Sequence, residues 1–170
     1  MFIYTESVTT GMSIFTLNKK ARLLMVLLLF WFIFFSGFKF FEVDGDSMNP
    51  TLKHGTKVFV NTIYCKIVTP ERWDILVVED PSKNRDHLIK RVIGLPNEKI
   101  QIKDGYIWID GIGLKEDRER MRLGESLYPV DQHPIHLKKD EYFLIGDNRN
   151  STWYGVVEKK NIKGILVNQR

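Results

Sequence analysis

The stretch KIQIKDGYIWIDG, residues 99–111, decides the fold class of this chain. Isoleucine alternates with polar or charged residues before Asp104, and this period of two is typical of a half-buried β-strand. Asp104 and Gly105 form the dipeptide that two-residue hairpin turns prefer, because such turns need positive φ angles. The sequence therefore predicts an antiparallel hairpin, with a second turn at Asp110 and Gly111.

Further strands are predicted where β-branched and aromatic residues gather in short runs. These runs are TKVFVNTIY (56–64), DILVVED (74–80), EYFLIGDNRN (141–150) and IKGILVN (162–168). The segment 114–132 carries a dense run of charge and is predicted to be a surface excursion between strands. The domain is therefore expected to be mainly β, with an antiparallel sheet.

The composition limits the functional classes to which the protein can belong. The chain has 170 residues, 44% of them hydrophobic, which is enough for one core and an appendage. Its net charge of +4 is small and scattered, and no nucleic-acid-binding motif accompanies it, so we expect no nucleic acid as a partner. The single cysteine, Cys65, excludes an intrachain disulfide and is expected to be a packing residue. His133 and His136 lack a third ligand nearby, so we expect surface or packing roles for all four histidines, and neither a metal nor a cofactor.

An apolar run precedes the predicted strands. LLMVLLLFWFIFFSGF, residues 23–38, is uncharged, and a helix continuing to Phe41 is about 28 Å long, close to the hydrocarbon thickness of a bilayer. A buried core helix is the alternative, but a run that is apolar on every side has nothing comparable to pack against in this chain. Basic residues at positions 19, 20 and 22 predict a cytoplasmic N-terminus and a single-pass protein of the plasma membrane, with the rest of the chain on the outer face. The expected parts are a cytoplasmic tail (1–22), a transmembrane anchor (23–41) and an extracytoplasmic domain (42–170).

Two short stretches carry a serine and a lysine that suit catalysis. GDSMNPTL contains Ser47 in a polar turn, and HLIKRVIGLP contains Lys90. In an extended strand Lys90 lies in line with Leu88 and Val92, and burial among apolar neighbours lowers the pKa of a lysine. A neutral lysine can act as the general base that a serine nucleophile needs. The alternative is that Lys90 pairs with a surface carboxylate and that Ser47 only caps a turn.

Three stretches in order, GDSMNPTL, IKRVIGLPNEK and YFLIGDNRN, resemble successive boxes of the bacterial type I signal peptidases, which are membrane-bound serine proteases. The resemblance runs from about residue 30 to residue 164. It implies an antiparallel β-sheet catalytic domain of the signal-peptidase type that removes signal peptides from exported preproteins after small residues, at Ala-x-Ala sites. The implied partners are preprotein signal peptides and the lipid bilayer, and we expect a monomer without a cofactor.

The resemblance also implies roles for individual residues. Ser47 would be the nucleophile, Lys90 its general base, and the Ser47 backbone N–H the oxyanion donor. Gly45 stands where some family members carry a second hydroxyl for the oxyanion. The residues implied to line the substrate pockets are Met48, Leu52, Leu88 and Ile89, and those implied as structural support are Gly146, Asp147, Asn148 and Arg149.

One segment departs from the family pattern. After GDNRN the family continues with a serine and an Asp-Ser-Arg unit before an aromatic-glycine pair, whereas this chain reads STWYGVV. Ser151 is retained and is expected to orient Lys90, and we predict that Asp147 and Arg149 pair in place of the missing unit. The missing unit keeps a second interpretation open, a membrane-anchored inactive homologue that binds preproteins without cleaving them. A self-cleaving repressor-type protease is disfavoured, because it would need an amino-terminal DNA-binding domain.

Overall fold

The computed structural model describes residues 18–103, 106–114, 133–149 and 152–167. The chain divides into two compact units, Met1–Ser36 and Gly37–Arg170. The strands that the structure describes all lie in the second unit and form two sheets.

The described part of the first unit forms the helix α1 (Lys19–Ser36). The Asn18 side chain caps its first turn by accepting a hydrogen bond from the Ala21 backbone N–H at 2.8 Å. The apolar side chains from Leu23 to Phe32 are 55–69% exposed. Among the described residues, no helix combines the length and the apolar character needed to cross a membrane.

The predicted extension of this helix to Phe41 is wrong, because the chain changes to a strand after Gly37. β1 (Phe38–Glu42) pairs antiparallel with β2 (Lys57–Asn61), and the Phe38 ring stacks on Phe59 with centroids 4.6 Å apart. The Gly37 carbonyl accepts hydrogen bonds from the Thr62 backbone N–H and from its hydroxyl. These contacts with a distant segment stabilise the extended backbone.

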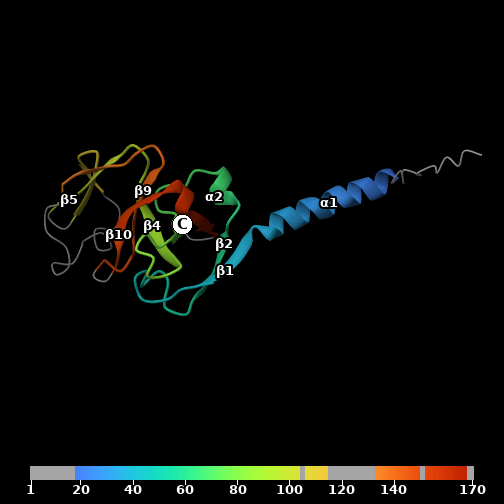
Figure 1. Cartoon of the computed structure of the whole chain (residues 1–170), viewed down its shortest axis with the longest axis horizontal. Coiled ribbons are helices and arrows are strands. Elements are labelled where there is room, and N and C mark those ends of the chain that lie inside the picture. The colour runs from blue at the N-terminus through green and yellow to red at the C-terminus, as the bar shows by residue number, and fades with distance from the viewer. Residues whose placement is uncertain (1–17, 104–105, 115–132, 150–151, 168–170) are drawn as a thin grey trace, which may run out of the picture. The chain divides into compact units, whose positions relative to one another are not determined.

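The larger sheet confirms the predicted antiparallel β class. Its seven strands run in the order β1-β2-β11-β3-β4-β9-β10, and every neighbouring pair is antiparallel. Figure 1 shows β4 beside β9 and β10 in the body of this unit. The remaining strands of this sheet are β3 (Ile75–Glu79), β4 (His87–Gly94), β9 (Glu141–Ile145), β10 (Tyr154–Glu158) and β11 (Ile162–Leu166).

Strand β3 is buried on both faces of this sheet. Leu76 and Val78 pack in one apolar cluster, together with Leu144 of β9. Ile75 and Val77 belong to a second cluster. Because successive strand residues point to opposite faces, the alternation places β3 between two cores, which explains its continuous apolar sequence.

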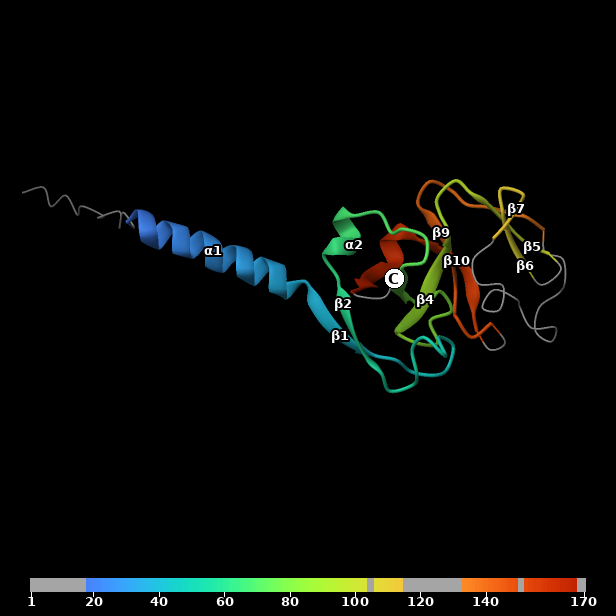
Figure 2. The same cartoon turned by 180° about the vertical axis from the view of Figure 1, so that it is seen from behind.

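The smaller sheet forms around the stretch that predicted the fold. Its order is β7-β6-β5-β8, and β5 and β6 pair with Lys103 opposite Tyr106. Residues 104 and 105 lie outside the described residues, but the second predicted turn is present, with φ of 51° at Asp110 and 79° at Gly111. Figures 1 and 2 show β5, β6 and β7 at the end of this unit away from β1 and β2. The bounds are β5 (Lys99–Lys103), β6 (Tyr106–Ile109), β7 (Ile112–Gly113) and β8 (Ile135–His136).

A third apolar cluster joins the two sheets. It combines Ile93, Phe143 and Ile145 of the larger sheet with Ile100 and Ile107 of the smaller one. The predicted surface excursion lies, apart from its first residue, outside the described residues.

Two further segments differ from the prediction, one because a strand ends early and one because a strand was not predicted. The strand predicted over 56–64 ends at Asn61, whose side-chain oxygen accepts hydrogen bonds from the backbone N–H groups of Ile63 and Tyr64. This turn leads into α2 (Tyr64–Ile67), in which Cys65 is buried, as expected of a packing residue. Strand β10 was not predicted, and the short 3₁₀ helix η1 (Lys159–Asn161) connects it to β11.

Candidate active site

Lys90 is buried in the middle of the larger sheet. It lies on β4 directly opposite Leu76 of β3, and its exposed fraction is 3%. The alternate residues Leu88 and Val92 are buried as well, which confirms the predicted common environment.

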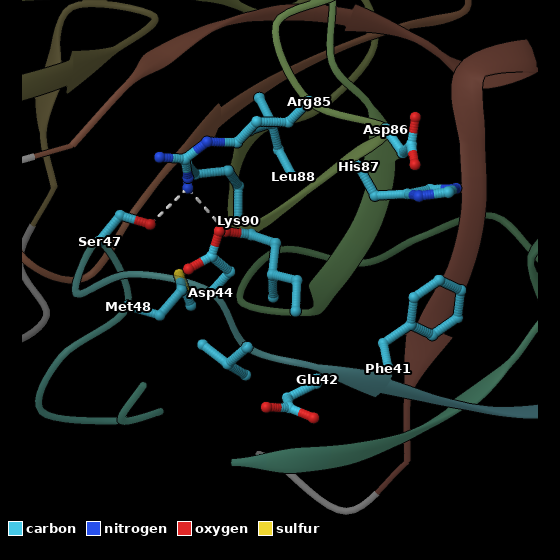
Figure 3. Close-up of a pocket in the computed structure, with 12 residues that line it drawn as sticks. Phe41, Glu42, Asp44, Ser47, Met48, Arg85, Asp86, His87, Leu88 and Lys90 are labelled. Atoms are coloured by element: carbon cyan, nitrogen blue, oxygen red, sulfur yellow. Dashed lines mark hydrogen bonds between the residues drawn. The ribbon is translucent and has the colours of Figure 1, made fainter. Parts of the chain in front are cut away.

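The amine of Lys90 contacts the hydroxyl of Ser47. Nζ lies 2.7 Å from Ser47 Oγ and donates a second hydrogen bond to the Ile89 carbonyl oxygen at 2.9 Å (Figure 3). Burial, and after it the positive charge of Arg85, lower the pKa of Lys90 to about 8 against the opposing effect of the charges of Asp147 and Asp80. A substantial fraction of Lys90 is therefore neutral near pH 8, so its lone pair can accept the hydroxyl proton.

Ser47 lies in a compact turn that follows β1. Hydrogen bonds from the Asn49 N–H to the Asp46 carbonyl, at 3.0 Å, and from the Leu52 N–H to the Met48 carbonyl, at 2.9 Å, close this turn. Within the described residues, no hydrogen bond engages the Ser47 backbone N–H. That donor is therefore available to a bound group.

The segment after β9 holds the serine turn from the other side. The Asn148 backbone N–H donates to the Ser47 carbonyl at 3.0 Å, and its side-chain amide donates to the Asp46 carbonyl at 3.1 Å. A Cβ at Gly146 would lie 2.2 Å from the Ser47 carbonyl oxygen, so this close approach requires glycine. Three chain segments that are far apart in sequence therefore fix Ser47 beside Lys90.

Asp147 is buried and binds Arg91, not Arg149 as predicted. Its carboxylate accepts hydrogen bonds from Arg91 Nε at 2.8 Å and Nη2 at 2.6 Å, and from the Thr51 hydroxyl at 2.5 Å. Burial disfavours the charged carboxylate, but these hydrogen bonds outweigh burial and hold the pKa of Asp147 below its usual range. Arg149 is also buried, and its Nε and Nη1 donate no hydrogen bond within the described part of the chain.

A pocket of about 310 Å³ opens beside Ser47 and Lys90 (Figure 3). Three of the four residues that the resemblance assigned to substrate pockets line it, namely Met48, Leu88 and Ile89. Leu52 does not line it, because its side chain is buried in the cluster with Val77. The other lining residues are Phe41, Glu42, Val43, Asp44, Ser47, Arg85, Asp86, His87 and Lys90.

Three residues of the site, Ser151, Arg85 and Arg91, differ from the expectation or lie beyond its test. Ser151, the residue expected to orient Lys90, lies outside the described residues. Sequence reasoning missed Arg85 in the pocket and Arg91 as the partner of Asp147. One signal for Arg91 was available. Arg91 directly follows Lys90 in a predicted strand, and neighbouring strand residues face opposite ways, so its side chain is expected on the face opposite to Lys90. In the described part of the chain, no cluster of three or more His, Cys, Asp or Glu side chains could hold a metal.

Comparison with known proteins identifies the family of this chain. The model of the family described as "Signal peptidase, peptidase S26" matches residues 17–168. The chain belongs to the signal peptidase family. Signal peptidase I P of Bacillus subtilis subsp. natto is 33% identical over 156 residues, which cover 86% of this chain and 83% of the relative. Signal peptidase I V of Bacillus subtilis (strain 168) is 34% identical over 141 residues, covering 74% and 82%.

Part of the chain also resembles a solved structure. The signal peptidase I of Enterococcus faecalis V583 is 27% identical, and the match covers 59% of this chain and 98% of that chain with a TM-score of 0.48. The family assignment rests on the sequence matches, which make this protein a hydrolase of the signal peptidase class.

The buried ion pair of this signal peptidase predicts a strong effect of removing one partner. We expect Arg91→Met to lower the free energy of unfolding by about 3–5 kcal/mol, because Asp147 is left buried without its guanidinium. Urea titration of the full chain, followed by tryptophan fluorescence, measures the change.

The matched control is Lys99→Met on β5, an exposed cation that should change stability by less than about 0.5 kcal/mol. The double variant Arg91→Met/Asp147→Leu should regain part of the loss, because no lone charge remains. Equal stability of Arg91→Met and wild type would contradict the role given to the pair.

Proposed function

We propose that this protein is a membrane-bound serine endopeptidase that removes signal peptides, with Ser47 as nucleophile and Lys90 as general base. The observation that carries the proposal is the 2.7 Å contact between Lys90 Nζ and Ser47 Oγ, formed by an amine that is 3% exposed. The relatives' name, signal peptidase I, supports the substrate class.

The proposed reaction has two halves. Ser47 Oγ bonds to the scissile carbonyl carbon while its proton moves to Lys90 Nζ, and the carbonyl electron pair moves to oxygen. The C–N bond then breaks, and the leaving amine takes the proton from Lys90. Water attacks the acyl-enzyme with Lys90 again as the base, which releases the signal peptide as a carboxylic acid and restores the Ser47 hydroxyl.

The pocket beside this pair supports cleavage after small residues. Its apolar walls come from Met48, Leu88 and Ile89, and its volume is about 310 Å³. Apolar walls beside the nucleophile favour uncharged side chains such as alanine. We therefore propose that substrates are preproteins with Ala-x-Ala cleavage sites, and that the protein acts as a monomer.

We further propose that the first unit attaches the protein to the plasma membrane, with the N-terminus in the cytoplasm and the catalytic unit on the outer face. The apolar side chains of α1 from Leu23 to Phe32 are more than half exposed. Such a surface is stable in lipid. Basic residues at the start of α1 favour a cytoplasmic N-terminus.

Cleavage of a preprotein tests the catalytic pair. We expect full-length wild type in detergent to cut a preprotein at its Ala-x-Ala site, and Ser47→Ala and Lys90→Ala each to lower the rate by at least about 10³-fold. Lys99→Ala, which removes an exposed cation from β5, should cleave like wild type. Mass spectrometry of the products measures both the rate and the bond that is cut.

The same assay separates the proposal from the inactive homologue. An intact preprotein that is nevertheless retained by wild type would favour a protein that binds preproteins without cleaving them. Cleavage that survives in Ser47→Ala would contradict the assigned nucleophile.

The pKa of Lys90 predicts the pH dependence of cleavage. Below about pH 8 the amine is protonated and cannot accept the Ser47 proton, so kcat/KM should fall about tenfold for each pH unit. Above pH 8 the rate should rise to a plateau. The profile is measured between pH 6 and 10 with a substrate that does not titrate in this range, and a constant rate from pH 6 to 9 would contradict a lysine base.

Membrane attachment is tested by fractionation. We expect the full chain to sediment with membranes and to resist extraction at alkaline pH, because about 0.8 kcal/mol per buried CH₂ stabilises an inserted apolar helix. A variant lacking residues 1–36 should remain in the supernatant. Recovery of the full chain in the supernatant would contradict the proposal.

A further inference from the structure

Arg85 places a guanidinium in the pocket beside Ser47 and Lys90. Its side chain lines the same pocket as both residues, and Figure 3 shows it reaching across the pocket toward them. Within the described residues its guanidinium makes no hydrogen bond or ion pair, although the carboxylates of Asp44 and Asp86 also line this pocket. A guanidinium has five N–H donors, all of which are free to bind a group that enters the pocket.

The backbone that carries Arg85 is held by a buried carboxylate. Asp80 is 8% exposed and accepts hydrogen bonds from the Ser82 backbone N–H at 2.8 Å, the Ser82 hydroxyl at 2.7 Å and the Arg85 backbone N–H at 3.1 Å. Arg85 lies two residues before the start of β4 at His87. The hydrogen bonds of the β3–β4 loop therefore fix the backbone position of Arg85, while its guanidinium forms no hydrogen bond within the described residues.

The end of that side chain lies where residue 45 would carry a side chain. A Cβ built on Gly45 would be 3.8 Å from Arg85 Nη1, and apart from the adjacent residues of the chain no other atom would lie within 4 Å of it. Gly45 comes two residues before the nucleophile, and its φ of +87° is a conformation that glycine favours. The guanidinium therefore lies close to the backbone that leads into Ser47.

The attack on a carbonyl creates the charge that such a donor could bind. When Ser47 Oγ bonds to the carbonyl carbon, its proton passes to Lys90 and the carbonyl oxygen becomes an oxyanion. The Ser47 backbone N–H is one available donor, and a second preorganised donor stabilises the transition state more than the neutral carbonyl.

We propose that the Arg85 guanidinium is a catalytic group, which donates a hydrogen bond to this oxyanion and completes a two-donor site with the Ser47 backbone N–H. The inference rests on the proposed function, because the oxyanion exists only if Ser47 is the nucleophile. Arg85 supplies from the β3–β4 loop the donor that Gly45 cannot provide.

A second effect of Arg85 must be separated from this one. Its positive charge also lowers the pKa of Lys90, so removal of the charge alone would move the rise of activity to higher pH. On the alkaline plateau Lys90 is neutral in every variant, and a guanidinium keeps its charge there. The plateau rate therefore reports the oxyanion contact alone.

The experiment measures kcat and KM of the full chain from pH 7 to 10 for wild type, Arg85→Gln, Arg85→Lys and the control Lys83→Gln. Lys83 is an exposed cation in the same loop, but it does not line the pocket. We expect Arg85→Gln to lower the plateau kcat on the order of 10- to 100-fold with little change in KM. Arg85→Lys should lie between the two, and Lys83→Gln should match wild type.

Chemical rescue gives an independent measurement. Free guanidinium should raise the plateau kcat of Arg85→Ala, whereas sodium at equal ionic strength should not, and wild type should respond to neither.

The outcomes that overturn the inference are distinct from failure of the proposed function. A plateau rate for Arg85→Gln equal to that of wild type, with only the rise of activity moved to higher pH, would show that Arg85 acts through Lys90 and would overturn the oxyanion role. A folded Arg85→Gln protein with raised KM and unchanged kcat would overturn it too. Absence of Ser47-dependent cleavage by wild type would overturn the proposed function together with this inference.

Discussion

The hydrogen bond between Lys90 Nζ and Ser47 Oγ sets a condition that the surrounding structure has to meet, since an amine can take the serine proton only in its neutral form. The larger sheet meets this condition through the face on which Lys90 lies. Leu88 and Val92, the alternate residues of β4, are buried with Lys90, so its amine is removed from water. The positive charge of Arg85 lowers the pKa of Lys90 as well.

The serine has the opposite requirement, because it must be both accessible and fixed. A half-buried turn would be mobile by itself, and the contacts from Asn148 and Gly146 supply the rigidity. Asp147 is in turn fixed by Arg91, which follows Lys90 on the same strand. Two consecutive residues of β4 therefore serve the site in different ways, one by contacting the serine and the other by holding the segment that supports it.

The sequence predicted the features that depend on local pattern. The antiparallel class followed from alternation around residues 99–111, and the burial of Lys90 followed from its spacing to Leu88 and Val92. The end of α1 could not be predicted in this way, because the strand after Gly37 is stabilised by β2, a segment about 20 residues further along the chain. An aromatic-rich stretch such as Phe38–Glu42 suits a helix in lipid as well as a strand, and only its pairing partner decides between them.

Within the site, the limit of prediction was the identity of side-chain partners. Arg91 and Asp147 are 56 residues apart, and neither composition nor spacing distinguishes Arg91 from Arg149 as the partner of Asp147. Leu52 shows the same limit for apolar residues. A leucine beside the serine turn can face the pocket or the core, and here it packs in the core with Val77.

The loop between β3 and β4 combines a fixed backbone with exposed side chains in the pocket. Arg85 and Asp86 are exposed and line the pocket, while hydrogen bonds to the buried Asp80 hold the backbone of the loop. Replacements at these positions alter the electrostatic and steric character of the pocket at little cost in folding free energy. Under the proposed function, an engineer can therefore vary cleavage rate and substrate preference at these two positions without redesigning the fold.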